Sequence, residues 1–206
     1  MLSIRRIFLL AVLLLLAAAT AVSGQRRPVE LGLDAMFAFQ NPSGSGNNFF
    51  TVDGPIGGMN SFTPMHGLRA AFGLTDLISV EPSLGFNLWS ETDNALGDEE
   101  SISRFGFSTS ILVHRSADID RTVPFVGVGG NFINFNASDT DAASQFGAHA
   151  FAGLNVPVVD RLAVRFAVGG ARFFENDDFS SRWTAFGTLG LSFWPGDGGR
   201  VVTAAR

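Results

Sequence analysis

The sequence has no cysteine among its 206 residues. Disulfide frameworks, thiolate zinc sites, cysteine nucleophiles and lipoprotein acylation are therefore excluded. Long apolar runs are also lacking, because beyond residue 24 no stretch is apolar over the roughly 20 residues that a membrane-spanning helix needs. Positive charge is scarce as well, since 14 Lys and Arg stand against 19 Asp and Glu, a formal net charge of −5. We expect no nucleic-acid partner, because nucleic acids bind basic surfaces.

The one long apolar run lies at the start of the chain. Arg5 and Arg6 precede an apolar stretch that ends at Ala19, and small residues follow up to Gly24. A basic start, a short apolar core and a small-residue end are the three parts of a secretory signal peptide. The core is too short for a spanning helix, which favours cleavage over retention as an anchor. We predict a signal peptide over residues 1–24, an exported barrel domain over 25–194 and a polar C-terminal tail over 195–206.

Apolar and polar residues alternate through most of the remaining chain. In the first such segment Leu31, Leu33 and Phe37 fall on one face, and Glu30 and Asp34 fall on the other. A period of two residues indicates a strand. Eight segments share this pattern, around residues 29–40, 68–74, 78–88, 104–114, 126–132, 146–155, 162–169 and 184–193.

The connections between these segments alternate in length. Long polar connections are expected over residues 41–62, 90–100, 136–144 and 174–182, and shorter ones around Thr75, Ala117 and Val158. Short turns on one rim and long loops on the other are typical of an outer-membrane barrel. The long loops are acidic, which indicates solvated loops, or else a weak calcium or magnesium site.

Alternation alone does not say which face points inward, because a soluble lipocalin-like barrel alternates too. An eight-stranded barrel has an interior only wide enough for side chains to fill. The face rich in Phe, Leu, Ile and Val is therefore predicted to meet lipid, and the face of Gly, Ser, Ala and Asn to fill the lumen. An Arg that faces lipid at mid-depth costs about 2 to 4 kcal/mol, so the charges of the small face should pair inside. The predicted lumen network, structural or gating, comprises Glu30, Asp34, Arg69, Glu81, His149 and Arg165.

Two residue types carry local expectations. Trp89, Trp183 and Trp194 fall at strand ends, where aromatic residues form interfacial girdles. Pro82 falls in the middle of a strand, where it removes a ladder hydrogen bond, so we expect a bulge or a local distortion there.

Three stretches of the chain, Val123–Phe132, Gly73–Val80 and Gly187–Phe193, carry a resemblance that extends from Val29 to Trp194. They resemble the small outer-membrane β-barrel family, the OmpA/OmpX-like transmembrane domains. The resemblance implies an all-β fold, an eight-stranded antiparallel up-and-down transmembrane β-barrel in the cell outer membrane. It also implies a monomer whose partners are outer-membrane lipid or lipopolysaccharide and the barrel assembly machinery. Many such proteins end in an aromatic residue that this machinery reads, whereas here a polar tail follows Trp194.

No local motif selects a catalytic or metal-binding residue. The histidines lack the spacing of a metal site, and neither Ser108 nor Ser144 stands in a nucleophile motif. We expect no enzyme activity, no cofactor and no metal, and a structural envelope or surface-interaction role with an unidentified surface ligand. The alternatives are a narrow pore or transporter, a lipid A-modifying enzyme and a secreted lipocalin-like binder.

Overall fold

A computed structural model describes residues 29–42, 49–53, 67–92, 99–137, 143–177 and 179–195. The predicted signal peptide, and the predicted tail beyond Pro195, lie outside these residues. No helix in the described part of the chain is long and apolar enough to cross a membrane.

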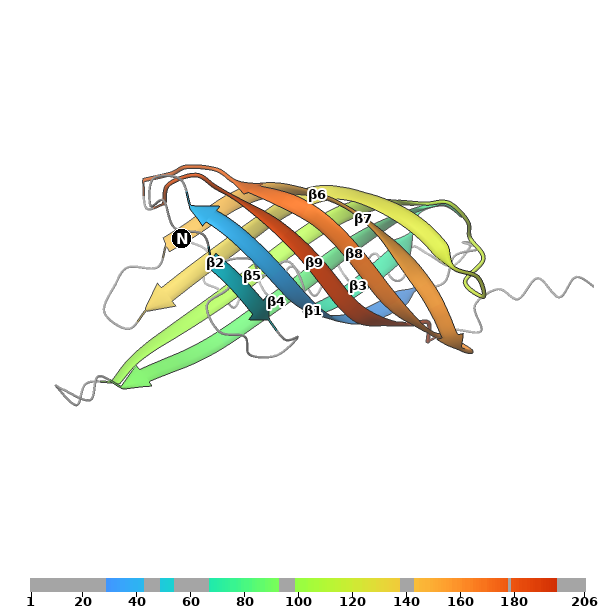
Figure 1. Ribbon diagram of the computed structural model, residues 1–206, viewed down its shortest axis with the longest axis horizontal. Coiled ribbons are helices and arrows are strands. Elements are labelled where there is room, and N and C mark those ends of the chain that lie inside the picture. The colour runs from blue at the N-terminus through green and yellow to red at the C-terminus, as the bar shows by residue number, and fades with distance from the viewer. Residues whose placement is uncertain are drawn as a thin grey trace, which may run out of the picture.

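The described residues form one antiparallel sheet that closes on itself (Figure 1). Consecutive strands pair with one another from β3 to β9, and β1 pairs with both β3 and β9. Eight strands thus make the barrel wall, as predicted. The strands are β1 (Glu30–Pro42), β2 (Phe49–Asp53), β3 (Leu68–Gly73), β4 (Ile78–Thr92), β5 (Glu99–His114), β6 (Val123–Ala137), β7 (Ala143–Val159), β8 (Leu162–Phe173) and β9 (Arg182–Phe193).

Strand β2 was not expected. It lies within the segment predicted as the first long loop, and it pairs only with Met36–Gln40 of β1. β2 lies along the same edge of β1 as β3, which pairs with residues Glu30–Leu33 at the start of β1. The sequence signal for this strand is weak because only five residues take part.

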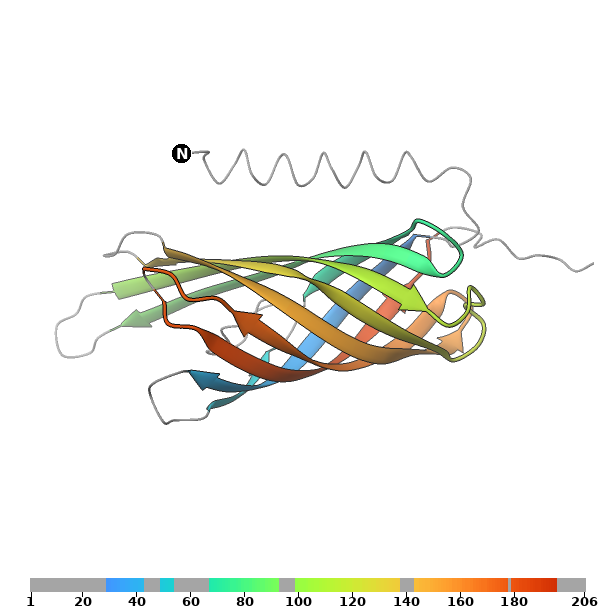
Figure 2. The same cartoon turned by 90° about the horizontal axis from the view of Figure 1, so that it is seen from above.

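The connections β3–β4, β5–β6 and β7–β8 lie at one end of the barrel, and we call the opposite end the loop rim (Figure 2). Several strands extend further toward the loop rim than predicted. β4 and β5 continue to Thr92 and from Glu99, so that only residues 93–98 connect them, and residues 138–142 connect β6 to β7. Neither connection is longer than the 115–122 connection at the other end. Polar residues show where a strand leaves an apolar layer, but the backbone hydrogen bonds of the strand can continue beyond that point. The loops predicted over 90–100 and 136–144 were therefore too long.

Most of the bulky apolar side chains point away from the lumen, as predicted. Val168 is 67% exposed and Phe146 is 62% exposed. The same face carries Leu31, Leu33, Phe37, Phe39, Ile111, Val113, Val126, Val128, Leu154, Phe166, Leu189, Leu191 and Phe193. This direction contradicts the lipocalin-like alternative, in which such residues would line the inside.

The lumen is less uniformly small and polar than predicted. Phe125, Phe151, Phe173 and Phe186 share the inner face with the charged residues, and each is at most 6% exposed. Glycines on neighbouring strands make room for them. A Cβ on Gly127 would lie 2.6 Å from the ring of Phe151. The alternation itself holds, but glycine leaves volume that an inward ring fills.

The aromatic girdle is only partly as expected. Trp183 is exposed at the loop rim, with its ring 6.3 Å from that of Phe39. Trp194, in contrast, is 2% exposed, so its predicted place in a girdle is wrong. It continues the inner face of Thr188 and Ser192 by alternation. The side chain of Trp89 lies outside the described residues.

Pro82 produces no bulge. β4 keeps one register with β5 through the Pro82–Thr109 pair, and pairs with β3 occur on either side of Pro82. The missing N–H interrupts the ladder locally without inserting a residue. A register shift occurs instead between Pro157 and Val159 of β7, beside a tight turn in which Arg161 has a φ of 66°.

Candidate functional site in the barrel lumen

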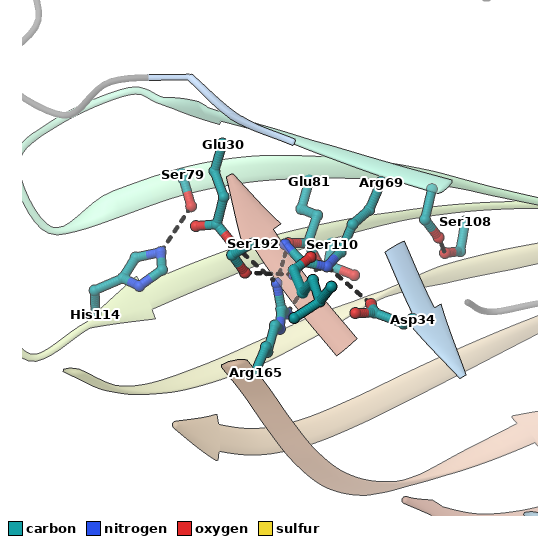
Figure 3. Close-up of polar contacts among 12 residues, drawn as sticks. Glu30, Asp34, Arg69, Ser79, Glu81, Ser108, Ser110, His114, Arg165 and Ser192 are labelled. Atoms are coloured by element: carbon teal, nitrogen blue, oxygen red, sulfur yellow. Dashed lines mark hydrogen bonds and ion pairs between the residues drawn. The ribbon is translucent and has the colours of Figure 1, made fainter. Parts of the chain in front are cut away.

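Five charged side chains meet inside the barrel (Figure 3). Glu30 and Asp34 come from β1, Arg69 from β3, Glu81 from β4 and Arg165 from β8. Strand alternation turns each of them inward, and each is at most 4% exposed. We call these five residues the ionic brace.

Arg69 is bonded through all three of its guanidinium nitrogens. Its Nε donates to Asp34 Oδ2 at 2.8 Å, and its Nη1 donates to Glu30 Oε1 at 2.5 Å. The same Nη1 lies 3.5 Å from Glu81 Oε2. Its Nη2 donates to the hydroxyl of Ser192 at 2.5 Å and to the backbone oxygen of Leu191 at 3.3 Å, which extends the brace to β9.

Arg165 crosses the lumen to Glu81. Its Nη1 and Nη2 donate to Glu81 Oε2 and Oε1 at 2.5 and 3.0 Å. Its Nη1 is also 3.7 Å from Glu30 Oε1. β8 and β4 lie on opposite sides of the barrel, because β5, β6 and β7 separate them along one path and β3, β1 and β9 along the other. The pair therefore spans the full width of the lumen.

Two glycines provide the space that the brace occupies. A Cβ on Gly32 would lie 2.2 Å from Arg69 Cζ, and a Cβ on Gly190 would lie 1.7 Å from Asp34 Oδ1. Any larger residue at either position would displace a bonded ion. The close approach of the backbone to these ions is thus a reason for glycine on β1 and β9.

The charges of the brace depend on one another. Three carboxylates face two guanidinium groups within a space from which bulk water is removed. Burying an ion costs several kcal/mol, and pairing offsets that cost only while both partners remain. Removal of one partner therefore leaves an uncompensated buried charge.

His149 lies apart from the brace. Its Nε2 is 2.7 Å from the hydroxyl of Ser110, and its ring stacks on Phe151 with 5.6 Å between centroids. No hydrogen bond or ion pair in the described part of the chain joins it to the five charged residues. Of the six predicted lumen residues, the structure thus brings five together and places His149 in a separate pair.

A second histidine pair was not singled out from the sequence. His114 is 2% exposed, and its Nε2 is 2.8 Å from the hydroxyl of Ser79. A third polar pair joins Ser83 to Ser108 at 2.5 Å. All four residues fall on the inner face of β4 and β5 by simple alternation, whereas the local sequence does not specify which of them pair.

The His149–Ser110 pair does not form a catalytic triad with an acid among the described residues. In a triad the second ring nitrogen of the histidine donates to an acid that orients it. His149 Nδ1 has no hydrogen-bond partner among the described residues, and Ser110 is buried in the lumen. Ser108 bonds another serine rather than a histidine. The described part of the chain also contains no group of three His, Cys, Asp or Glu side chains arranged to hold a metal ion.

Comparison with known proteins gives a consistent picture of the architecture. A family model described as outer membrane protein beta-barrel domain matches residues 8–193. Neisserial surface protein A (NspA) is similar in structure, with a TM-score of 0.53 at 10% identity over 81% of this chain and 96% of that chain. Sequence comparison with curated proteins gives no match.

Two further solved structures are similar over most of their length. The attachment invasion locus protein Ail of Yersinia pestis has a TM-score of 0.46 at 8% identity, covering 81% of this chain and 98% of that one. The outer membrane protein OprG of Pseudomonas aeruginosa has a TM-score of 0.44 at 12% identity, covering 84% and 98%.

Proposed function

The chain belongs to the outer membrane β-barrel protein family, and on that premise we propose that it is a non-enzymatic, non-conducting scaffold with a structural envelope or surface-interaction role. The protein lies in the outer membrane. We further propose that a signal peptide over residues 1–24 directs export and that the barrel assembly machinery inserts the chain. The protein then works as a monomer surrounded by outer-membrane lipid and lipopolysaccharide.

The ionic brace is the observation that carries this proposal. Arg165 and Glu81 close a bidentate pair across the width of the lumen, and Arg69 ties β3 to β1 and β9. Bidentate Arg–carboxylate pairs have a fixed geometry, so they hold the strands that bear them. Ion pairs across the lumen hold the strands in place, which supports rigid presentation of the loops. The same side chains occupy the lumen and leave little width for a solute to pass.

The β8–β9 connection supports the loop-presenting part of the proposal. Gln145 Nε2, buried at the loop rim, donates to the backbone oxygens of Phe174 and Ser180 at 2.9 and 3.2 Å. Asn176 Nδ2 donates to the backbone oxygen of Ser144 at 2.5 Å. These bonds fasten both ends of the loop to β7, while Glu175 and Asp177 stay exposed. Short turns of such barrels face the periplasm, which puts this loop outside the cell.

Electrical recording tests the non-conducting part. The full chain is reconstituted into planar bilayers after its folding has been checked by heat-modifiable migration on a gel. We expect no current above that of protein-free membranes. Discrete openings would instead favour the narrow pore, and the scaffold role would be abandoned.

Mass spectrometry of lipid A tests the non-enzymatic part. Lipid A from cells that express the chain should match lipid A from cells that carry an empty vector. A new mass that disappears with Ser110→Ala would contradict the proposal.

The surface role is tested by exchanging Glu175 and Asp177 for Gln and Asn, which should change adhesion or detergent resistance of the cells without altering the amount of folded barrel.

A further inference from the structure

The inner face of β7 is polar toward both of its ends and aromatic between them. From the loop rim inward it presents Gln145, His149, Phe151 and Asn155, all at most 6% exposed. Gln145 Oε1 and His149 Nδ1 have no hydrogen-bond partner among the described residues, and neither has the amide oxygen or nitrogen of Asn155. Unmatched polar atoms thus lie toward both ends of the strand, and an aromatic ring separates them.

The ring of Phe151 belongs to a layer that extends over several strands. It meets the ring of Phe125 from β6 edge-on, with centroids 6.1 Å apart, and the ring of Phe186 from β9 at 6.4 Å. Leu112 from β5 reaches the same place, because a Cβ on Gly127 would lie 2.6 Å both from its Cδ2 and from the Phe151 ring. We call Leu112, Phe125, Phe151 and Phe186 the aromatic septum.

Buried polar atoms without protein partners favour bound water, whereas packed apolar rings exclude it. A buried polar atom without a partner destabilises the fold, and buried waters typically satisfy such atoms. Asn131 of β6 adds a second unmatched amide on the loop-rim side, since it follows Gly129, the register partner of His149. Apolar side chains in contact offer water no partner, so a layer of them stays dry.

We propose that water enters the lumen from both ends and that the aromatic septum, rather than the ionic brace, keeps the two hydrated parts apart. The inference rests on the non-conducting role proposed above and assigns the barrier to particular side chains. The brace adjoins the septum, because the Arg165 guanidinium carbon lies 4.3 Å from the centroid of Phe125 and 5.9 Å from that of Phe151. Breaking the brace would therefore enlarge one hydrated part without joining it to the other.

Proton leak through reconstituted barrels tests this assignment, because protons pass readily along a continuous file of hydrogen-bonded water, whereas a dry apolar layer stops them. The septum variant is Phe151→Ser with Phe186→Ser, in which small hydroxyl groups replace both rings. The brace variant is Glu81→Gln with Arg165→Gln, which removes two opposite charges at once. Phe166→Ser is the matched control, since Phe166 is 48% exposed on the outer face. Each full-length variant is placed in vesicles that hold a pH-sensitive dye, after heat-modifiable migration has shown that it is folded.

We expect the septum variant to raise the proton leak about tenfold or more over the wild type, which corresponds to a barrier lowered by about 1.4 kcal/mol. The brace variant and the Phe166→Ser control should leak like the wild type. Should the septum variant fail to fold, Leu112→Ser opens the opposite side of the same layer with a smaller change and should also raise the leak.

Two results would overturn the inference while leaving the non-conducting role intact: a leak in the brace variant with the septum present, or a folded septum variant as tight as the wild type. A leak through the wild-type barrel would be a different failure, because it would remove the proposed function as well.

Discussion

The guanidinium group of Arg165 lies over the ring of Phe125, with 4.3 Å between its central carbon and the ring centroid. The same guanidinium donates two hydrogen bonds to Glu81. One side chain therefore joins the ionic and the aromatic parts of the lumen. A planar guanidinium suits both contacts, since it bonds a carboxylate in a bidentate manner and stacks on a ring.

Loss of Arg165 should destabilise the barrel strongly. Arg165→Ala leaves Glu81 buried without its main partner, and we expect a loss of about 3–5 kcal/mol in the free energy of unfolding. Urea unfolding in detergent micelles, followed by tryptophan fluorescence, measures it. Arg172→Ala on the same strand is the control, because Arg172 is exposed and bonds Ser181 at 3.0 Å, so its loss should cost about 1 kcal/mol or less. Equal effects of the two substitutions would contradict the bracing role.

Adjacent glycines on β8 should respond differently to the same change. A Cβ on Gly169 would lie 2.4 Å from the backbone oxygen of Ala150 and 2.6 Å from Phe151 Cβ, whereas on Gly170 the nearest atom is 3.6 Å away. Gly169→Ala should therefore destabilise by about 1–3 kcal/mol, as overpacking does. Gly170→Ala should stay within about 0.5 kcal/mol of the wild type, as surface changes do. The same urea titration decides, and a Gly169→Ala barrel of undiminished stability would show that the inner face is not tightly packed.

The loss of stability caused by a charge on the outer face should depend on how deep in the bilayer the charge lies. Val168 is 67% exposed in the middle of β8, and Val158 is 58% exposed beside the turn at the end of β7. Val168→Arg should cost about 2–4 kcal/mol in lipid, and Val158→Arg about 0–1 kcal/mol. Unfolding from lipid vesicles measures both. Equal tolerance of arginine at the two positions would mean that no hydrocarbon surrounds the middle of the barrel.

Gln145 should control the order of the β8–β9 connection. Gln145→Ala removes two hydrogen bonds to the loop, each worth about 1 kcal/mol. Deuterium exchange of the backbone amides over residues 174–177 should become faster, while exchange within β8 stays slow. Ser180→Ala serves as the control, because Gln145 bonds the backbone of Ser180 and not its side chain. Unchanged exchange in Gln145→Ala would mean that the loop is ordered by other contacts.

Much of this architecture is encoded in local sequence patterns. Side chains alternate along a strand with a period of two, so Leu31 and Leu33 had to share one face, and Glu30 and Asp34 the other. One face carries most of the bulky apolar residues, and a lumen that side chains fill completely cannot hold all of them, so that face has to point outward. The barrel and its outward apolar surface were therefore predictable from the sequence.

The details inside the lumen were not predictable in the same way. The alternation placed Arg165 and Glu81 on the inner face, but their pairing depends on strand order and stagger across the whole barrel. The inward rings of Phe151 and Phe186 depend on the empty volume over Gly127 and Gly169, which belong to other strands. Trp194 was predicted wrongly in a girdle, because the inward alternation of β9 continues through it even though it lies at the strand end. Contacts between distant strands therefore carried the information that local patterns lacked.

The most direct test of the account is the direction of side chains along β8. Because the chain has no cysteine, a single introduced cysteine gives one labelled site. Nitroxide labels on Phe166→Cys, Ala167→Cys and Val168→Cys are compared in lipid vesicles by their collision rate with dissolved oxygen, which concentrates in hydrocarbon. We predict high rates at positions 166 and 168 and a low rate at 167. The opposite order would place the phenylalanine face inside the barrel and contradict the account.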